Sequence, residues 1–311
     1  MNIVKNKKWF FLISAIVIIP GIISLILFGL KFSIDFTGGS KLEFQISNFK
    51  SQISNRNISD TFESNKAKVH KIEKISEDTF RVQTDPIEQS KKNDIVRDFG
   101  KYGKVTEKSF ETVGPTIGRE TETNAIKAVI IASIAITLYI AFAFRKVSNP
   151  SGPEALRAGG LVSSWKYGVC AIAALLHDVL IVVGIFSILG KLFSVEVDSL
   201  FITALLTVMG FSVHDTIVVF DRIRENLRKN FDLKFDEVVN NSLLETLNRS
   251  LNTSLTVVIV LFALLLFGGE SVRWFIVALL VGIISGTYSS IFNASQLLVA
   301  WYERDKKRRK T

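Results

Sequence analysis

Two His-Asp pairs lie inside long apolar segments and are the strongest candidates for chemistry in this chain. His177-Asp178 and His214-Asp215 each interrupt an apolar run. A carboxylate near the middle of a membrane span costs roughly 2.5–3.5 kcal/mol on insertion scales, and lipid offers it no partner. Such a group should face a protein interior or a wet cavity. Because proton or ion movement is the usual role of ionisable residues in such positions, both pairs are candidates for a proton path.

The apolar runs around these pairs are long enough to cross a membrane. At about 1.5 Å per residue, a run of about 20 residues matches a hydrocarbon core ~30 Å thick. A soluble protein would distribute its apolar residues over periodic segments and would not gather them in continuous blocks. The predicted spans are 9–30, 125–144, 167–189, 199–220, 251–267 and 274–302. We therefore predict a polytopic α-helical membrane protein with six transmembrane helices.

Lysine and arginine gather in alternate short loops, and this bias predicts the orientation. The opposite short loops hold only Lys191 and Arg273. The predicted cytoplasmic segments are 1–8, 221–250 and 303–311, and the predicted external domain is 31–124. Both termini are thus expected on the cytoplasmic side. The basic tail suits a surface of anionic lipid, and no nucleic-acid motif accompanies it, so no nucleic-acid partner is expected.

The external segment has the pattern of a small α+β domain. Its apolar alternation predicts the order strand, helix, two strands, helix, strand, which is that of a ferredoxin-like sandwich. The second helix is predicted to begin at Pro86, with Asp85 as its cap. Two glycine-rich junctions bracket the domain, and their main residues are Asp35, Gly38, Gly39, Gly114 and Pro115. Turn chemistry accounts for them, and so does a hinge between the domain and the membrane.

The last two spans each carry polar residues within one helical arc. On the fifth span these residues are Arg249, Asn252, Thr253 and Thr256. On the sixth they are Ser285, Ser289, Asn293 and Gln296. Gly282-x-x-x-Gly286 would let another helix approach closely. Together the spans predict a bundle with a hydrated or hydrogen-bonded interior.

Simpler interpretations of these residues stay open. Asp178 and Asp215 could join neighbouring helices without changing charge, and both histidines could be packing residues. Arg249 could be a snorkelling anchor at a helix end. No spacing such as H-E-x-x-H supports a metal site, and no G-x-x-x-x-G-K-[ST] motif supports ATP as the energy source. We expect no cofactor, with protons as the coupling ion.

Several long sequence blocks resemble the SecF subunits of SecDF protein-export complexes, in the resistance-nodulation-division superfamily. The blocks are DFTGG at 35–39, VGPTIGRE at 113–120, LLHDVLIVVGIF at 175–186, EVDSLFITALLTVMGFSVHDTIVVFDRIREN at 196–226 and NRSLNTSLT at 248–256. The resemblance covers essentially the whole chain. It implies a non-enzymatic subunit of the bacterial inner membrane that works with SecD beside the SecYEG channel, with YajC as a further candidate partner. The proton-motive force would then help to draw exported, unfolded polypeptide outward.

The resemblance also implies roles for single residues. Asp215 matches the family's proton-linked aspartate, and Arg249 and Thr253 match an arginine and the threonine one turn later. The family usually has asparagine before that aspartate, whereas this chain has His214, which adds a titratable group. Asp215 would be neutral when protonated and would pair with Arg249 when ionised, which gives the bundle two electrostatic states. The alternative functions are a half-size secondary exporter of small molecules in the same superfamily and a scaffold without energy coupling.

Overall fold

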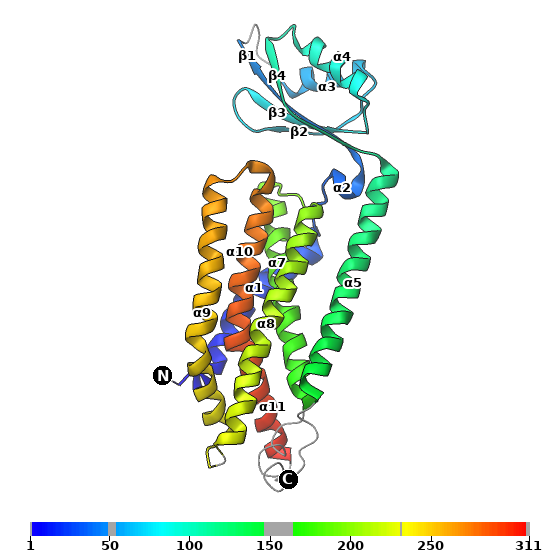
Figure 1. The fold of residues 1–311 in the computed structure, drawn as a ribbon. Helices are drawn as coiled ribbons and strands as arrows, with labels where there is room; N and C mark the ends of the chain where they lie inside the picture. Colours follow the sequence, from blue (N-terminus) through cyan, green and yellow to red (C-terminus); the bar gives the residue numbers. More distant parts are fainter. Residues whose placement is uncertain (1, 49–53, 146–163, 231, 309–311) are drawn as a thin grey trace. The chain divides into compact units, whose positions relative to one another are not determined.

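The structure, a computed structural model, describes residues 2–48, 54–145, 164–230 and 232–308. It divides into two compact units, one formed by Met1–Lys31 with Ala128–Thr311 and the other by Phe32–Lys127. Among the described residues, six helices are long and apolar enough to span a membrane (Figure 1). The prediction of a polytopic, helical, multi-pass membrane protein is therefore confirmed.

Most of the helices extend further than the predicted spans, although α1 ends two residues before the predicted end of its span. The long helices are α1 (Lys7–Phe28), α5 (Pro115–Arg145), α7 (Ser164–Phe193), α8 (Ser199–Lys229), α9 (Phe235–Phe267), α10 (Arg273–Tyr288) and α11 (Ser295–Arg308). Short helices precede α1 (η1, Val4–Asn6) and α10 (η2, Glu270–Val272), and the π-helix η3 (Ser289–Ala294) joins α10 to α11. Most of the predicted 221–250 loop is thus helical, because apolar residues such as Ile223, Val239 and Leu243 pack these ends of α8 and α9 into the core.

Two seams of small residues hold the bundle together. Along α1 and α7, Ser14 meets His177, Gly21 meets Gly184 and Ser24 meets Ser187, so the two helices run parallel in a constant register. Along α8 and α10–η3, Val208 meets Gly282, Ser212 meets Gly286 and Thr216 meets Ser290, again in one register. The Gly282-x-x-x-Gly286 motif therefore does bring a second helix close, and that helix is α8.

Gly282 offers a test of the α8–α10 seam, because a Cβ atom there would overlap the Val208 side chain. We expect Gly282→Ala to destabilise the bundle by about 1–3 kcal/mol, as overpacking usually does. Adding Val208→Ala should recover most of that loss, since the second change makes room for the new methyl group. Thermal unfolding of the purified chain measures both. A single variant as stable as the parent, or a double variant no better than the single one, would contradict the packing.

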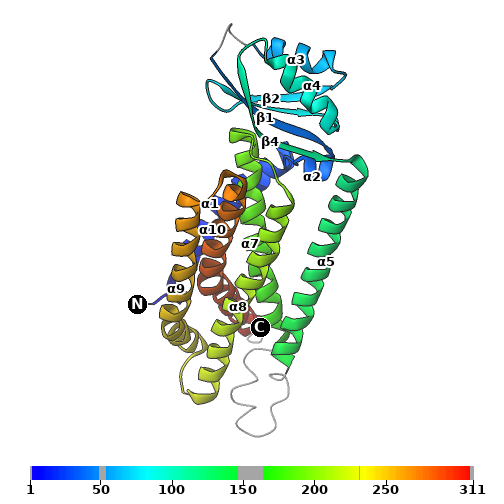
Figure 2. The same ribbon diagram turned by 45° about the horizontal axis from the view of Figure 1, so that its top comes forward.

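The second unit is a four-stranded antiparallel sheet with two helices on one face (Figure 2). Its elements in chain order are α2 (Ile34–Thr37), β1 (Gly39–Ser47), α3 (Asn55–Ser64), β2 (Val69–Lys74), β3 (Thr79–Thr84), α4 (Gln89–Phe99) and β4 (Lys104–Val113). The strand order across the sheet is β2-β3-β1-β4. Alternate residues of β1 are buried, and they pack with Ile58 and Phe62 of α3 and Ile95 and Phe99 of α4.

The prediction that this second helix begins at Pro86 is wrong. Helix α4 begins at Gln89, with Glu88 as its extended N-cap residue. The backbone N–H of Ile87 donates to the Ser40 hydroxyl at 2.8 Å, and the Ile87 side chain is buried. This hydrogen bond to β1 keeps residues 86–88 out of the helix, which therefore begins three residues after the proline.

An ion pair between α4 and β4 lies at the edge of this core. The Lys92 side chain is buried, and its Nζ lies 2.6 Å from Glu107 Oε2 on β4 and 5.6 Å from the Phe110 ring centre. We expect Glu107→Ala to destabilise the sheet by about 1–3 kcal/mol, because it leaves a buried ammonium without its charged partner. Hydrogen exchange of the β1 amides in the full chain measures this. Glu111→Ala, at an exposed position of the same strand, is the matched control, and equal exchange in both variants would contradict the role of the pair.

The two glycine-rich junctions contact one another inside this unit. Gly38 and Gly39 have φ values of +71° and +126°, which side chains rarely adopt, and a Cβ on Gly38 would lie 3.1 Å from the Pro115 Cα. A Cβ on Gly118 would lie 2.8 Å from the Gly38 nitrogen, whereas one on Gly114 would meet nothing within 4 Å. Asp35 lies in the first turn of α2. Close backbone contact thus explains most of these glycines, and the hinge stays a prediction.

Candidate functional site

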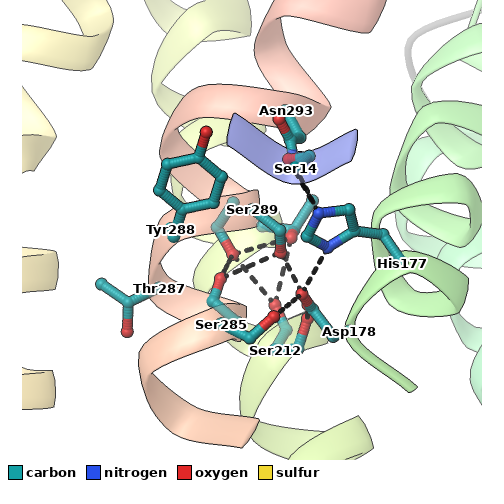
Figure 3. Close-up of polar contacts among 12 residues, drawn as sticks. Ser14, His177, Asp178, Ser212, Ser285, Thr287, Tyr288, Ser289 and Asn293 are labelled. Carbon is teal, nitrogen blue, oxygen red and sulfur yellow. Dashed lines mark hydrogen bonds and ion pairs between the residues drawn. The ribbon is translucent and has the colours of Figure 1, made fainter. Parts of the chain in front are cut away.

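Asp178 is the centre of a buried polar cluster (Figure 3). Its carboxylate is fully buried, and four groups donate to it. Oδ1 accepts from the Ser285 hydroxyl at 2.7 Å and faces His177 Nδ1 at 2.9 Å, and Oδ2 accepts from Ser212 at 2.5 Å and Ser289 at 2.6 Å. Two donors on each oxygen fill the accepting capacity of a carboxylate. The cluster therefore joins α7, α8, α10 and η3 through one side chain.

The far side of the His177 ring extends the cluster to α1. Nε2 of His177 lies 2.9 Å from the Ser14 hydroxyl and 2.9 Å from Asn293 Nδ2, which also donates to Ser14 at 2.8 Å. An amide nitrogen has only hydrogens to offer, so Nε2 is the accepting nitrogen in this arrangement. With the Asn293 amide in this orientation, the ring hydrogen lies on Nδ1 and points at Asp178.

Asp215 has a very different environment, although it too is buried. Its Oδ1 accepts one long hydrogen bond, from the Ser250 hydroxyl at 3.2 Å. Its Oδ2 has no hydrogen-bond partner in the part of the chain that the structure describes. A carboxylate with one free oxygen can accept a proton without displacing a donor, whereas Asp178 would have to release one. Of the two acids, Asp215 is the better placed to bind and release a proton.

The other predicted members of the proton path lie on the outside of this chain's bundle. His214, Arg249 and Thr253 are all exposed, and the Thr253 hydroxyl donates to its own helix at the Arg249 carbonyl, at 2.9 Å. Between the described side chains of Arg249 and Asp215 there is no ion pair within 4.0 Å. The expected pairing of Asp215 with Arg249 is therefore not formed in this structure. His177 and Asp178 are brought together, whereas Asp215 contacts Ser250 and the other three residues lie on the outside of the bundle.

The inward face of α9 was missed by the sequence analysis. It carries a ladder of small hydroxyl residues, all buried, at every fourth position: Ser242, Thr246, Ser250 and Ser254. Ser242 accepts from Asn226 Nδ2 at 3.0 Å, Ser250 donates to Asp215, and Ser254 contacts the Thr287 hydroxyl at 2.5 Å. The strict spacing of four was the available signal, but the sequence analysis considered only the more polar face with Arg249, and that face is exposed on this chain.

The cluster differs in its hydrogen bonding from a cation site. The hydroxyls around Asp178 all donate to it, which is opposite to the way in which oxygen ligands hold a cation. Among the described residues, no group of three or more His, Cys, Asp and Glu side chains lies close enough to hold a metal ion. Ser212 links the two acids, since it donates to Asp178 and lies one turn before Asp215 on α8.

Comparison with known families gives matches over most of the chain. The family described as "Protein export membrane protein SecD/SecF, C-terminal" matches residues 91–151 and 160–304, and the "SecD/SecF GG Motif" matches residues 23–48. The chain belongs to the SecD/SecF family. The GG motif corresponds to Gly38 and Gly39, whose conformations require glycine as described above.

Relatives named SecF and SecDF support this membership over nearly the full length of this chain. Protein translocase subunit SecF of Thermobaculum terrenum is 47% identical over 98% of this chain and 95% of its own length, and SecF of Anaerolinea thermophila is 42% identical over 97% and 94%. SecDF of Bacillus subtilis is 36% identical over 98% of this chain but only 38% of its own length. The crystal structure of SecDF from Thermus thermophilus, a translocon-associated membrane protein, matches with a TM-score of 0.79 at 33% identity, over 97% of this chain and 39% of that one. SecDF proteins thus contain a counterpart of this chain and a further, larger part.

Proposed function

We propose that this chain is the SecF-type half of a proton-driven machine for protein export, which works with SecD beside the SecYEG channel. Full-length similarity to translocase subunits named SecF supports the export role. Fused SecDF relatives support SecD as the partner, because the chain corresponds to only 38% and 35% of two of them. Because this chain matches only part of each fused relative, we expect it to need a partner, which counts against its acting alone as an exporter of small molecules.

The observation that carries the proton coupling is the environment of Asp215. The side chain is buried in a membrane-spanning helix, with one long hydrogen bond and one unpartnered oxygen. Leaving such a group ionised is unfavourable and protonating it removes the charge, so its protonation should change how α8 and α9 pack. Ser250 on α9 is the contact through which the change would pass between the helices.

We assign the polar outer surface of α8 and α9 to contact with SecD. His214, Arg249 and Thr253 are exposed on these helices at positions that would otherwise face lipid. Ionisable side chains in a membrane almost always face a bundle interior or a wet cavity. A partner bundle placed there would enclose Arg249 and Asp215 in a shared polar space, and Arg249 could then balance the charge of Asp215.

We propose that Phe32–Lys127 is a ferredoxin-like domain on the outer side of the membrane, where it holds emerging polypeptide. The order of its elements and the strand order β2-β3-β1-β4 support this fold. The excess of lysine and arginine in the loops on the opposite side supports the orientation, with both termini in the cytoplasm of a bacterium and the long helices α1, α5 and α7–α11 in its inner membrane. YajC would be a further partner of the assembly.

Reconstitution tests the proposed function directly. Vesicles would contain the channel and its motor, with both subunits, with SecD alone, or with neither, and an imposed proton gradient would be present or absent. We expect the gradient to increase completed export only when both subunits are present. Equal export without this chain would contradict the proposal, and gradient-driven efflux of dyes without any effect on export would favour the small-molecule exporter.

A further inference from the structure

The polar stripe on the last span continues beyond the Asp178 cluster. Ser285 and Ser289 donate to Asp178, and Asn293 donates to Ser14 and contacts His177. Gln296 comes next, at the start of α11 and three residues after Asn293. It is fully buried, yet it belongs to none of the contacts that hold the cluster together.

Unpartnered polar atoms gather at this point of the helix. Of the buried side-chain nitrogen and oxygen atoms that lack a hydrogen-bond partner among the described residues, four lie within residues 293–296. They are Asn293 Oδ1, Ser295 Oγ, and both Oε1 and Nε2 of Gln296. Buried amides are almost always hydrogen-bonded, and where protein does not supply the partner, ordered water does. Gln296, with no partner on either atom, therefore marks a site for water.

This site lies next to Asn293, which contacts His177. Gln296 follows Asn293 by three residues, and both side chains are buried with polar atoms that lack a partner among the described residues. Asn293 Nδ2 contacts the accepting nitrogen of His177, while Asn293 Oδ1 is free. The π-helix η3 ends between Asn293 and Ser295, and such segments are frequent at functional sites.

We propose that Asn293 and Gln296 hold internal water beside His177, and that this water carries protons between the buried imidazole and the end of the bundle where both termini lie. That end is identified by the hydrogen bond from Lys7 to Glu303 at 2.5 Å (Figure 1). A hydronium ion relayed along this water donates a proton to Nε2 of His177 and becomes neutral water, the Asp178 carboxylate at Nδ1 stabilises the resulting imidazolium, and loss of the same Nε2 proton to water regenerates hydronium. No other reactant is needed.

The groups that face His177 are few. Asp178 lies on its own helix, Ser14 faces it from α1 and Asn293 from η3. Among the described residues the Asp178 carboxylate is the one charged group in contact with the ring. The inference goes beyond the proposed function and does not depend on it, because Asp215 and export have no part in the argument.

Histidine is a built-in probe for this site, because the chain contains only three: His70, His177 and His214. The full chain in lipid nanodiscs would be labelled with ¹⁵N-histidine, and the His177 signal would be assigned with His70→Gln and His214→Gln variants. Exchange with solvent deuterium of the hydrogen that Nε2 of His177 gains on protonation, recorded as the pH is lowered, is the measurement. We expect Nε2 to exchange readily despite the burial of the ring, while the neutral ring keeps its hydrogen on Nδ1.

Matched methionine variants give the decisive comparison. Gln296→Met removes the amide at nearly constant length and should slow His177 exchange about tenfold, since the water loses its anchor. Leu298→Met changes an equally buried position two residues away and should leave exchange unchanged. Gln296→Asn keeps an amide, and partial recovery with it supports the water site even if the methionine variant folds poorly. No exchange in the parent chain, or equal rates in the parent and the folded Gln296→Met variant, would overturn the proposal.

Discussion

Replacing Asp215 with asparagine is expected to abolish the gradient-dependent part of export while the subunit still assembles with SecD. Asparagine keeps the shape of the side chain and the hydrogen bond from Ser250, but it cannot gain or lose a proton. Moving one charge through 100 mV is worth about 2.3 kcal/mol, which corresponds to a change of about 50-fold in a conformational equilibrium. The variant should lose that bias and fall to the rate measured without a gradient.

The matched control for this variant is Asp221→Asn, on the same helix. Its carboxylate is exposed, and it lies 3.6 Å from Arg224 in the next turn. The same loss of charge at position 221 should leave gradient-driven export at the parent level. Export by Asp215→Asn at the parent rate would contradict proton coupling through this residue, and equal loss in both variants would show that the effect is general charge on α8.

Asp178 is expected to act on stability more than on coupling. Asp178→Ala leaves three serine hydroxyls and His177 without their acceptor in the interior of the bundle. Removing one member of a buried charged network typically destabilises by about 3–5 kcal/mol. The purified variant should therefore unfold at a much lower temperature or fail to accumulate in the membrane.

Ser289→Ala is the graded comparison for this prediction. It removes a single donor and leaves the carboxylate with three others, so the expected loss is only about 1 kcal/mol. Thermal unfolding in the same detergent measures both variants against the parent chain. If Asp178→Ala were as stable as Ser289→Ala, the carboxylate would not be the centre of the cluster.

The sequence was enough to predict the spans and the two acids because both are local signals. In a chain of this composition, a continuous apolar run of about 20 residues indicates a membrane span. An acid inside such a run indicates a site that faces protein or water and not lipid. The element order of Phe32–Lys127 followed in the same way from alternation along each strand. The start of α4 could not be predicted, since it depends on the contact of Ile87 with Ser40 on a distant strand.

The faces of the last two spans needed the structure. Arg249 and Thr253 form the more polar arc of α9, yet the ladder of Ser250 and Ser254 packs inward, because small hydroxyl side chains allow close approach of α8 and α10. The π-helix η3 also changes the helical phase between Ser289 and Gln296, which a uniform step of 100° does not anticipate. The different roles of the two acids depend on donors from other helices, and one sequence does not show these.

Infrared difference spectroscopy of the assembled complex, recorded as the pH is lowered, tests the central claim most directly. Protonated carboxylic acids have a carbonyl band that carboxylates lack. The account predicts that one component of this band is present in the parent and in Asp221→Asn but missing in Asp215→Asn, and that no component belongs to Asp178. A spectrum of Asp215→Asn identical to that of the parent would contradict the claim that the proton binds at this residue.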